Sequence, residues 1–447
     1  MSAKVIVLGL DGVPPELLFS DAIASRMPNI SALRRRGHSG PLRSVTPPIT
    51  VPAWACAVTG KDPGQIGLYG IRNRRGGSYD FSVARSTDVT ADAIWDVLGR
   101  AGRRSVVIGL PPGNPPRHIA GEWVGCMLTP EGTPEFTWPP ELRSEITDTI
   151  GRYVFDVEGF RRVDRAELLE RIWDMTARRW ELARHLLQTR ETDLFILHEI
   201  GTDRLHHGFW ADHATDHPKH DPNGRFRTAV VDYYEKLDRE IGDLLALAPD
   251  AQVFVLSDHG CKTMVGGIRA NQWLIENGYL TMTSSSGEAR PFSAAEVDWS
   301  RTKAWAAGGY YGRVWLNLRG REVNGIVSPD DAPRILDEID AGLRSVDDAS
   351  GRPIDTQVFR PRDVYREVRG VAPDLLVYFG ALDWRSVATV GGSGLHTFEN
   401  DTGPDDANHS IDGILITTAP EQVPASPSLL DASSMLLAML GATPSRR

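Results

Sequence analysis

Short runs of apolar, mostly β-branched residues recur along this chain and alternate with longer stretches of helical periodicity. Each run spans only five or six residues and has few polar positions, which is typical of strands buried in a parallel sheet. The predicted strands are 5–10, 105–110, 193–198, 252–257 and 375–379. The predicted helices, with apolar residues three and four positions apart, include 91–101, 166–188 and 227–247. This alternation predicts an α/β fold with a mostly parallel central sheet and helices on both faces.

The length of 447 residues exceeds what one minimal core needs, so we expect one large core with inserted segments. Residues 111–140 are rich in Pro, Gly and Trp, and predict an irregular excursion that leaves the sheet and caps a site. A second insertion is expected before the chain returns to the sheet at Pro373. The predicted division is core at 1–110, a cap insertion at 111–184, core at 185–261, a second insertion at 262–369 and core at 370–447.

The composition excludes several classes of protein. The chain carries 49 Lys and Arg against 59 Asp and Glu, and its net charge of −10 argues against a nucleic-acid or membrane-surface partner. Cys56, Cys126 and Cys261 are too few and too scattered for a disulfide scaffold or a Cys-rich zinc module. The N-terminus shows no export-signal pattern, and no segment approaches the roughly 20 apolar residues of a transmembrane helix. These features predict a soluble, cytoplasmic protein and leave its oligomeric state open.

Three of the predicted strands lead into acidic residues. Asp11 follows the first strand, and Asp258 and His259 follow the fourth. The third strand leads toward Asp203 and His207, which are four residues apart and would share one face of a helix. Because ligands of open α/β sheets gather at the carboxyl ends of the strands, we expect these side chains to meet at one edge.

Each of these residues has a simpler explanation when it is taken singly. An acid at the end of a strand is often a turn or helix-cap residue, and a histidine often lies on the surface. Their conjunction at one edge favours a metal site, and mixed Asp and His ligands suit zinc, with manganese or iron as alternatives. The spacing does not separate His207 from His206, because a residue three positions from Asp203 reaches the same helix face.

Thr50 is the candidate nucleophile. Residues 52–58 predict a helix that has a proline in its first turn and ends before Gly60, so Thr50 lies at or just before a helix N-terminus. Free N–H groups and the helix dipole favour a phosphate at that position. The alternative is an ordinary threonine N-cap, and only the metal ligands elsewhere in the sequence outweigh it.

Five motifs occur in a fixed order along the chain. They are Leu10-Asp11-Gly12, Thr50-Val51-Pro52 followed by Thr59-Gly60-Lys61-Asp62-Pro63, Asp203 with His207, Ser257-Asp258-His259-Gly260, and a late histidine, His409. Together they resemble the alkaline phosphatase superfamily, specifically its type I phosphodiesterase and nucleotide pyrophosphatase family. The resemblance extends over most of the chain.

This resemblance implies two divalent metal ions, most simply Zn²⁺. It assigns one ion to Asp203, His207 and His409, and the other to Asp11, Asp258, His259 and the Thr50 oxygen. His396 is an alternative to His409 for the last ligand. The resemblance also implies a phosphothreonine intermediate on Thr50.

The predicted function is hydrolysis of a small phosphate ester by a two-metal phosphodiesterase or nucleotide pyrophosphatase, with nucleotide-like substrates among the candidates. A phosphomonoesterase or phosphomutase on the same scaffold is the alternative, and a non-catalytic metal-binding protein is a further one. A dianionic monoester would need added cations, but the candidate arginines are predicted to be solvated or helix-face residues. These are Arg74, Arg204, Arg269 and Arg313.

Trp123 and Trp138 lie in the predicted cap. They would either offer a surface for a second substituent of the substrate or fill the space between cap and sheet.

Overall fold

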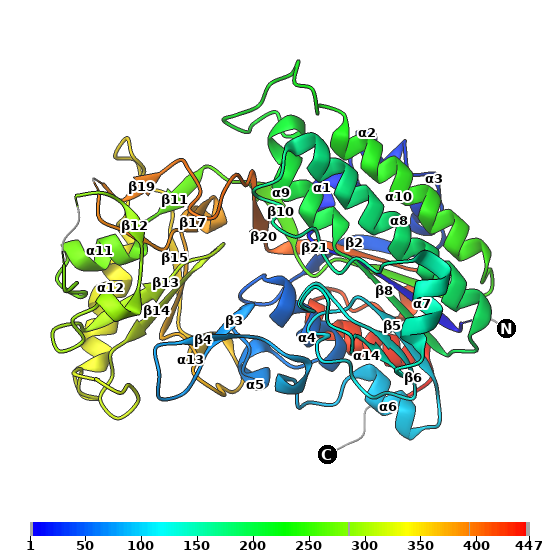
Figure 1. The fold of residues 1–447 in the computed structure, drawn as a ribbon, viewed down its shortest axis with the longest axis horizontal. Helices are drawn as coiled ribbons and strands as arrows, with labels where there is room; N and C mark the ends of the chain where they lie inside the picture. Colours follow the sequence, from blue (N-terminus) through cyan, green and yellow to red (C-terminus); the bar gives the residue numbers. More distant parts are fainter. Residues whose placement is uncertain (1–2, 285–286, 393, 444–447) are drawn as a thin grey trace.

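An eight-stranded sheet lies at the centre of the larger part of the molecule in the computed structural model, which describes residues 3–284, 287–392 and 394–443 (Figure 1). The strand order is β2-β21-β9-β1-β8-β5-β6-β7. The bounds are β1 Val5–Leu10, β2 His38–Arg43, β5 Ser105–Ile108, β6 Gly121–Val124, β7 Thr137–Trp138, β8 Leu194–Glu199, β9 Gln252–Leu256 and β21 Asp412–Thr417. The strands β9, β1, β8, β5 and β6 run parallel, whereas β21 and β7 run antiparallel to them. The predicted α/β class is confirmed.

Alternating residues of each buried strand supply two hydrophobic cores. In β1, Ile6 and Leu8 contribute to one core, and Val5 and Val7 contribute to the other, as the two-residue period of a strand requires. The first core is covered by α1 Pro15–Leu18, α2 Asp21–Ala24, α3 Pro28–Arg36, α7 Leu142–Ile150, α8 Arg165–Thr189, α9 Gly201–His213 and α10 Ala229–Ala246. The second is covered by α4 Thr50–Thr59, α5 Pro63–Ile66, α6 Ile94–Arg100 and α14 Ala432–Met439. Figure 1 shows these two groups of helices on opposite sides of the sheet.

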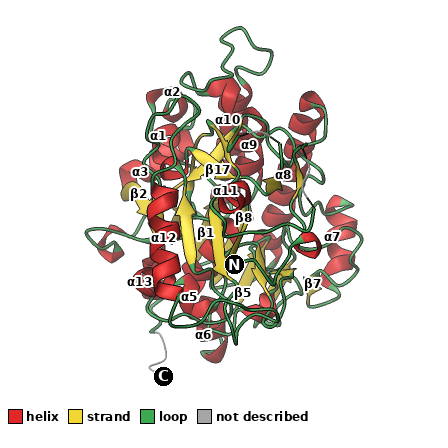
Figure 2. Ribbon diagram, turned by 90° about the vertical axis from the view of Figure 1, so that its left-hand side faces the viewer, coloured by secondary structure: helices red, strands yellow, loops and turns green. Residues whose placement is uncertain are grey.

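A smaller part, built mainly from residues 265–400, has its own hydrophobic core. It holds a four-stranded sheet, β13-β14-β16-β15, and a three-stranded sheet, β17-β11-β19. Its elements are β11 Gly266–Ile268, α11 Ala270–Glu276, β12 Arg290–Pro291, β13 Ala304–Ala307, β14 Gly312–Leu316, α12 Ala332–Arg344, β15 Gln357–Phe359, α13 Pro361–Val364, β16 Leu375–Tyr378, β17 Trp384–Ser386, β18 Thr389–Val390 and β19 His396–Thr397. Figure 2 looks onto this part, so α11 and α12 stand in front of the central strands.

Two two-stranded antiparallel pairs lie where the two parts of the molecule adjoin. The strands β3 Arg72–Arg74 and β4 Phe81–Val83 form one pair, and β10 Gly260–Thr263 and β20 Ala407–Ser410 form the other. The β10–β20 pair places the chain after residue 400 beside the segment that follows β9. Among the described residues, no helix is long and apolar enough to span a membrane.

Two predictions about the organisation of the chain were wrong. The predicted strand 375–379 corresponds to β16, but β16 pairs with β14 and β15 in the smaller part, so the chain returns to the central sheet at β21 instead of Pro373. Residues 111–140 do not leave the sheet entirely, because β6 and β7 extend its edge. The division into core and inserted segments remains a proposal.

The tryptophans of this segment contribute to packing. Trp123 is fully buried, and its ring meets Trp95 edge-on at 5.1 Å. Trp138 stacks on His118, and its Nε1 donates to the carbonyl of Ile119. Trp123 therefore fills the core and does not offer a surface to a substrate.

Candidate metal centre and active site

The central strands bring the predicted site residues to one edge of the sheet. Asp11 directly follows β1, and Asp258 and His259 follow β9 after Ser257; β9 pairs with β1. On the other side of β1, β8 leads into α9, whose first turn carries Asp203 and whose second carries His207. The carboxyl ends of three adjacent parallel strands therefore supply five of the seven candidate ligands, as expected for an open α/β sheet.

The first group of candidate ligands consists of Asp203, His207 and His409. Oδ1 of Asp203 lies 3.2 Å from Nε2 of His207 and 3.8 Å from Nε2 of His409. His409 reaches this position because β20 pairs with β10, which places it opposite Cys261, two residues after His259. All three side chains are buried.

The second group consists of Asp11, Asp258 and His259. Nε2 of His259 lies 3.2 Å from Oδ2 of Asp258, 3.7 Å from Oδ1 of Asp11 and 3.4 Å from Oγ1 of Thr50. The rings of His259 and His409 stack at 3.8 Å, so the two groups adjoin. The structure thus brings all seven predicted residues together.

The alternatives left open by the sequence lie elsewhere. Nε2 of His206 faces the hydroxyl of Tyr234 at 3.0 Å. His396 lies in β19 of the smaller part, where its Nε2 meets the carbonyl of Asp347. Neither histidine belongs to a cluster of candidate ligands in the described part of the chain.

Each of the three carboxylates has one oxygen held by the protein and one that faces the site. Oδ2 of Asp11 accepts from Trp54 and His198, Oδ1 of Asp258 accepts from the Gly12 amide, and Oδ2 of Asp203 accepts from Arg204. Oδ1 of Asp11, Oδ2 of Asp258 and Nε2 of His409 are buried and have no hydrogen-bond partner. Buried acceptors are rarely left unpaired, so this donor set fits two divalent cations.

The three histidines are likewise oriented by the protein, each through a contact at Nδ1. Nδ1 of His207 lies 2.7 Å from Oδ1 of Asp405, that of His409 lies 2.8 Å from the Pro48 carbonyl, and that of His259 lies 2.9 Å from the Gly260 carbonyl. Each acceptor holds the proton on Nδ1 and leaves Nε2 free to face the site, which is how histidines are commonly oriented for a metal.

Burial and neighbouring charges shift the pKa values of two of these candidate ligands. Burial, and then the charge of Asp11, hold the pKa of Asp258 well above its usual value. Burial opposes a charge on His207, but Asp405 and Asp203 outweigh it and raise its pKa to about 9. A dication between Asp11 and Asp258 would relieve the repulsion between these two carboxylates.

Thr50 is the first residue of α4, and Ile49 occupies the N-cap position. The threonine hydroxyl makes no capping bond, so the structure excludes the ordinary N-cap role. One turn later, Trp54 passes over Gly9 of β1 and donates to Asp11; a Cβ at Gly9 would lie 2.5 Å from the Trp54 ring. The absence of a side chain at Gly9 therefore lets α4 dock close to the metal-site edge.

Several residues of the site were missed by the sequence analysis. Asp405 holds His207, and the ring of Tyr310 stacks on His207 at 4.8 Å and on His409 at 4.3 Å. Nε of Arg161 donates to Oδ2 of Asp405, at 2.9 Å. Only Trp54 had a usable signal, because it lies four residues after Thr50 on the same helix face. Asp405 lies in a polar loop without periodicity.

The prediction of solvated or helix-face positions was wrong for Arg74 and Arg313, which are buried strand residues, whereas Arg204 lies in helix α9. Arg74, Arg204 and Arg313 are buried, and Arg269 is half-buried. Arg204 binds Asp156 through Nε and Nη2, both at 2.7 Å, and also contacts Asp203. Its charge is therefore already neutralised by carboxylates of the chain.

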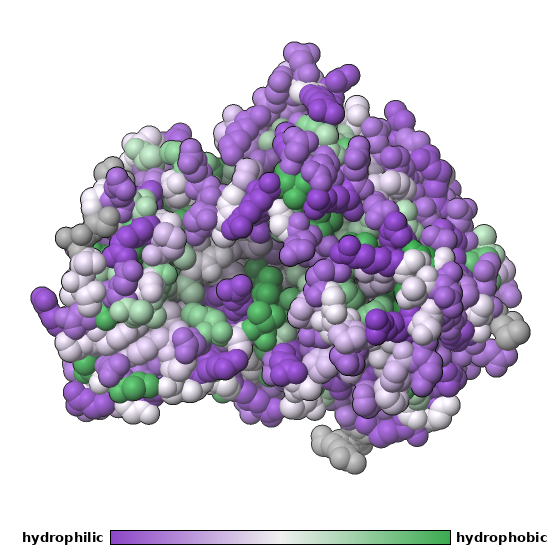
Figure 3. Space-filling model, viewed as in Figure 1, coloured by the Kyte–Doolittle hydropathy of each residue, from purple (hydrophilic) through white to green (hydrophobic). Residues whose placement is uncertain are grey.

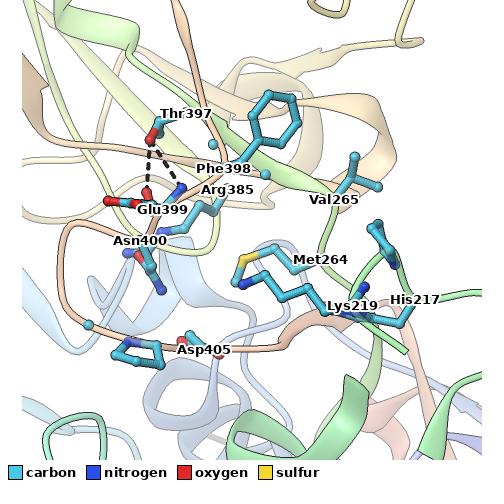
Figure 4. A pocket seen from close by; sticks show the side chains of 15 residues that line it. His217, Lys219, Met264, Val265, Arg385, Thr397, Phe398, Glu399, Asn400 and Asp405 are labelled. Atoms are coloured by element: carbon cyan, nitrogen blue, oxygen red, sulfur yellow. Dashed lines mark hydrogen bonds between the residues drawn. The ribbon is translucent and has the colours of Figure 1, made fainter. Parts of the chain in front are cut away.

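The space-filling view shows the molecule hollowed between its two parts (Figure 3). A pocket of about 500 Å³ lies between them, with Asp405 at its edge (Figure 4). Lys219 and Met264 approach it from one side, and Phe398 and Asn400 from the other. It includes none of the seven candidate ligands, because Asp405 lies on the Nδ1 side of His207, opposite Asp203.

Residues 5–405 match the sequence profile of the family described as type I phosphodiesterase / nucleotide pyrophosphatase. His409 lies beyond the matched segment, and the structure brings its Nε2 to 3.8 Å from Oδ1 of Asp203. A search of curated proteins gave no significant match.

Solved structures share the fold. The phosphonoacetate hydrolase from Sinorhizobium meliloti 1021, in complex with phosphonoformate, is 17% identical, with a TM-score of 0.63 over 99% of this chain and 96% of that one. Murine ectonucleotide pyrophosphatase / phosphodiesterase 5, in complex with AMP, is 13% identical, with a TM-score of 0.53 over 99% and 96% of the two chains. The human form is also 13% identical, with a TM-score of 0.55 over the same shares.

Proposed function

The chain belongs to the type I phosphodiesterase/nucleotide pyrophosphatase family of metal-dependent phosphoester hydrolases, and we propose that it cleaves small phosphodiesters with Thr50 as the nucleophile. The observation that carries this proposal is the position of Thr50, whose Oγ1 lies 3.4 Å from Nε2 of His259 at the start of α4. A hydroxyl that caps no helix and faces a cluster of candidate ligands is suited to attack.

The ligand sets proposed for the metals are Asp203, His207 and His409 for one ion, and Asp11, Asp258, His259 and the Thr50 oxygen for the other. The mixture of carboxylates and imidazoles favours zinc. Two bound cations would offset the negative charge that builds on the attacking and departing oxygens.

The chain itself supplies the nucleophile and its orientation. In the first step the Thr50 oxygen attacks phosphorus, a Thr–O–P bond forms and one alcohol departs. In the second step water displaces Thr50 and releases the phosphomonoester. The first N–H groups of α4 have no partner inside the helix and favour a phosphate oxygen at its N-terminus.

The charges around the site favour a monoanionic diester. The guanidinium of Arg204 is bound by Asp156 and Asp203, and that of Arg161 is bound by Asp405. Neither arginine has a charge left over for the second negative charge of a monoester. The same balance of charges also suits nucleotide-like pyrophosphate bonds, because the reacting phosphoryl group carries one negative charge, as that of a diester does.

The test is to trap the covalent intermediate. The metal-loaded protein is mixed with bis-p-nitrophenyl phosphate and quenched in acid, and the peptide that contains Thr50 is analysed by mass spectrometry. We expect a p-nitrophenyl phosphoryl group on Thr50. Thr59→Ala is the matched control, because Thr59 ends the same helix with its hydroxyl bonded to the Ala55 carbonyl. An adduct elsewhere, or turnover without any adduct at Thr50 in a rapid quench, would contradict the proposal.

A further inference from the structure

Arg313 is a buried cation without an acidic partner in the described part of the chain. It lies in β14, with 9% of its surface exposed. Nη1 donates to the carbonyl of Arg72 at 2.6 Å, and Nε is buried with no partner. The rings of Phe81, Tyr311 and Trp315 surround the guanidinium, with centroids 5.4 to 5.7 Å away. Aromatic faces attract a cation but do not neutralise it.

The other buried arginines of the described residues each have a carboxylate within 4 Å. The pairs are Arg74 with Glu322 at 2.5 Å, Arg179 with Glu199 at 3.8 Å, Arg204 with Asp156 at 2.7 Å and Arg385 with Asp401 at 3.4 Å. Because a buried charge is costly unless it is paired, the exception at Arg313 points to an anionic partner that the chain does not supply.

A pocket of about 440 Å³ opens beside this guanidinium. Arg72 and Arg313 line it, and its single acid, Asp80, is exposed and accepts from the hydroxyl of Ser78. The remaining walls combine alanine and glycine residues with four aromatic side chains, those of Tyr79, Phe81, Phe292 and Trp305. The formal charge of the lining is therefore positive, and its walls suit a flat or apolar group.

The position of the pocket connects it to the proposed active site. It is lined by Ala306, Ala307 and Gly308, which lead into the turn that carries Tyr310. Tyr310 in turn stacks on the ring of His409. Tyr310 and Arg313 are three positions apart, which corresponds to at most about 10 Å of extended chain. A substituent of a phosphodiester can span such a distance.

Gly70 makes room for the cation. A Cβ at this position would lie 3.0 Å from Nη1 of Arg313 and 3.0 Å from the hydroxyl of Tyr311. The chain at Gly70 therefore packs against the guanidinium and holds it in place.

We propose that this pocket binds a second oxyanionic group of the substrate, a carboxylate or phosphate carried on a flat substituent, through Arg313 and Arg72. The inference rests on the proposed phosphodiesterase function and names the class of diester that the site prefers. The phosphorus atom reacts at the metal centre, while the distal anion pairs with Arg313.

Binding is tested first, without turnover. Terephthalate, a flat dicarboxylate with no phosphorus, is titrated into the metal-loaded protein by calorimetry. We expect binding to the native chain, a loss of at least about tenfold in affinity in Arg313→Met, and partial recovery in Arg313→Lys. Arg75→Met, which removes a neighbouring exposed arginine outside the pocket, should bind as the native chain does. Equal binding by the native chain and Arg313→Met would overturn the proposal.

Kinetics then show whether the anion belongs to the substrate. The two substrates are p-nitrophenyl phenyl phosphate and p-nitrophenyl 4-carboxyphenyl phosphate, which differ only in the distal carboxylate. Arg313→Met should lower kcat/KM for the carboxylated diester by at least about tenfold, mainly through KM, and should leave the other diester within about twofold. Equal losses on both diesters would show a structural role and overturn the proposal. Terephthalate binding in a protein that cleaves neither diester would refute the phosphodiesterase function while the anion site stands.

Thermal unfolding of the variants is the control for their folding. Removing an unpaired buried charge should leave Tm of Arg313→Met at or above the native value, whereas Arg74→Met leaves the buried Glu322 with Arg321 as its remaining cation and should lower Tm. A marked fall in Tm for Arg313→Met would indicate that the guanidinium is a structural group and would count against an anion site.

Discussion

Oδ1 of Asp405 lies 2.7 Å from Nδ1 of His207, and the opposite nitrogen of that imidazole faces Asp203. In the other two histidines of the site, Nδ1 faces a backbone carbonyl. Among the three, His207 is therefore the one whose Nδ1 faces a carboxylate. A carboxylate behind an imidazole increases its basicity and fixes its orientation, which strengthens its bond to a metal. The structure thus distinguishes the two proposed metal positions by the groups behind their ligands.

Replacing Asp405 by Asn should weaken one metal position. We expect metal affinity at the position that contains His207 to fall by about 10- to 100-fold, while the other ion is retained. Competition with a chromophoric chelator measures both affinities. Glu399→Gln, an exposed acid of the same loop, is the control. An unchanged affinity in Asp405→Asn would mean that Asp405 serves only to hold Arg161 and the loop.

The pKa of His207 predicts how metal binding depends on pH. Because Asp405 and Asp203 raise this pKa to about 9, the metal-free chain holds a proton on His207 below that pH, and a metal ion must displace it. Apparent affinity should therefore rise with pH, by up to about tenfold per unit, and level off above pH 9.

The stability of the metal-free chain should have the opposite dependence. A raised folded pKa stabilises the chain below the ordinary histidine value, and this contribution is lost as pH rises through about 9. Metal titrations and thermal unfolding at pH 6.5, 7.5, 8.5 and 9.5 measure both effects. A metal affinity that falls over this range would refute the assignment of His207 as a ligand.

The adjacent histidines of α9 should behave differently when each is replaced by alanine. His207→Ala should reduce the bound metal from two ions to about one and abolish turnover. His206→Ala leaves the hydroxyl of Tyr234 unpaired and should cost about 1–3 kcal/mol of stability, but it should keep both ions. Elemental analysis of the purified variants distinguishes them, and the reverse pattern would exchange their roles.

Thr50→Ala should lower kcat by several orders of magnitude, because the two-step route through a covalent intermediate is lost. Ile49 holds the N-cap position, so the variant removes no capping bond, and its free energy of unfolding should change by less than about 1 kcal/mol. Steady-state kinetics and urea unfolding on one preparation provide both numbers. Native-like turnover would assign the attack to water.

The fold was predictable because the apolar runs are short, buried and separated by helical periodicity, which few architectures other than an α/β sheet accommodate. The three acidic strand ends followed directly from that sheet. The run 375–379 was assigned to the wrong sheet, since a buried strand has the same composition in either sheet and only its partners distinguish them.

The distant residues of the site were less accessible to sequence reasoning. His409 lies in the four-residue strand β20, whose sequence has no apolar pattern, and it reaches the site only through its pairing with β10. Spacing alone could not place His409; His396 was a rival for the last ligand, although it lies less well relative to the returning strand 414–417, and His409 was identified through the family resemblance. Asp405 and Arg161 come from loops more than 240 positions apart, and no local signal relates them.

The substrate preference follows from the ionic balance of the site. Four positive charges of two divalent ions would face Asp11, Asp203, Asp258 and an ionised Thr50, so the centre itself is close to neutral. Nearby, Arg204 is committed to Asp156 and Asp203. A diester adds one negative charge, which the N-terminus of α4 can help to stabilise, whereas a monoester adds two, and the guanidiniums that contact Asp203 and Asp405, those of Arg204 and Arg161, are already paired. We therefore expect kcat/KM for bis-p-nitrophenyl phosphate to exceed that for p-nitrophenyl phosphate by at least about tenfold, a difference of about 1.4 kcal/mol in transition-state binding.

A nucleotide p-nitrophenyl ester in the same series shows whether a base adds to the preference. A higher kcat/KM on the monoester would reassign the protein as a phosphatase or mutase, with the proposed roles of Thr50 and the metal ligands unchanged.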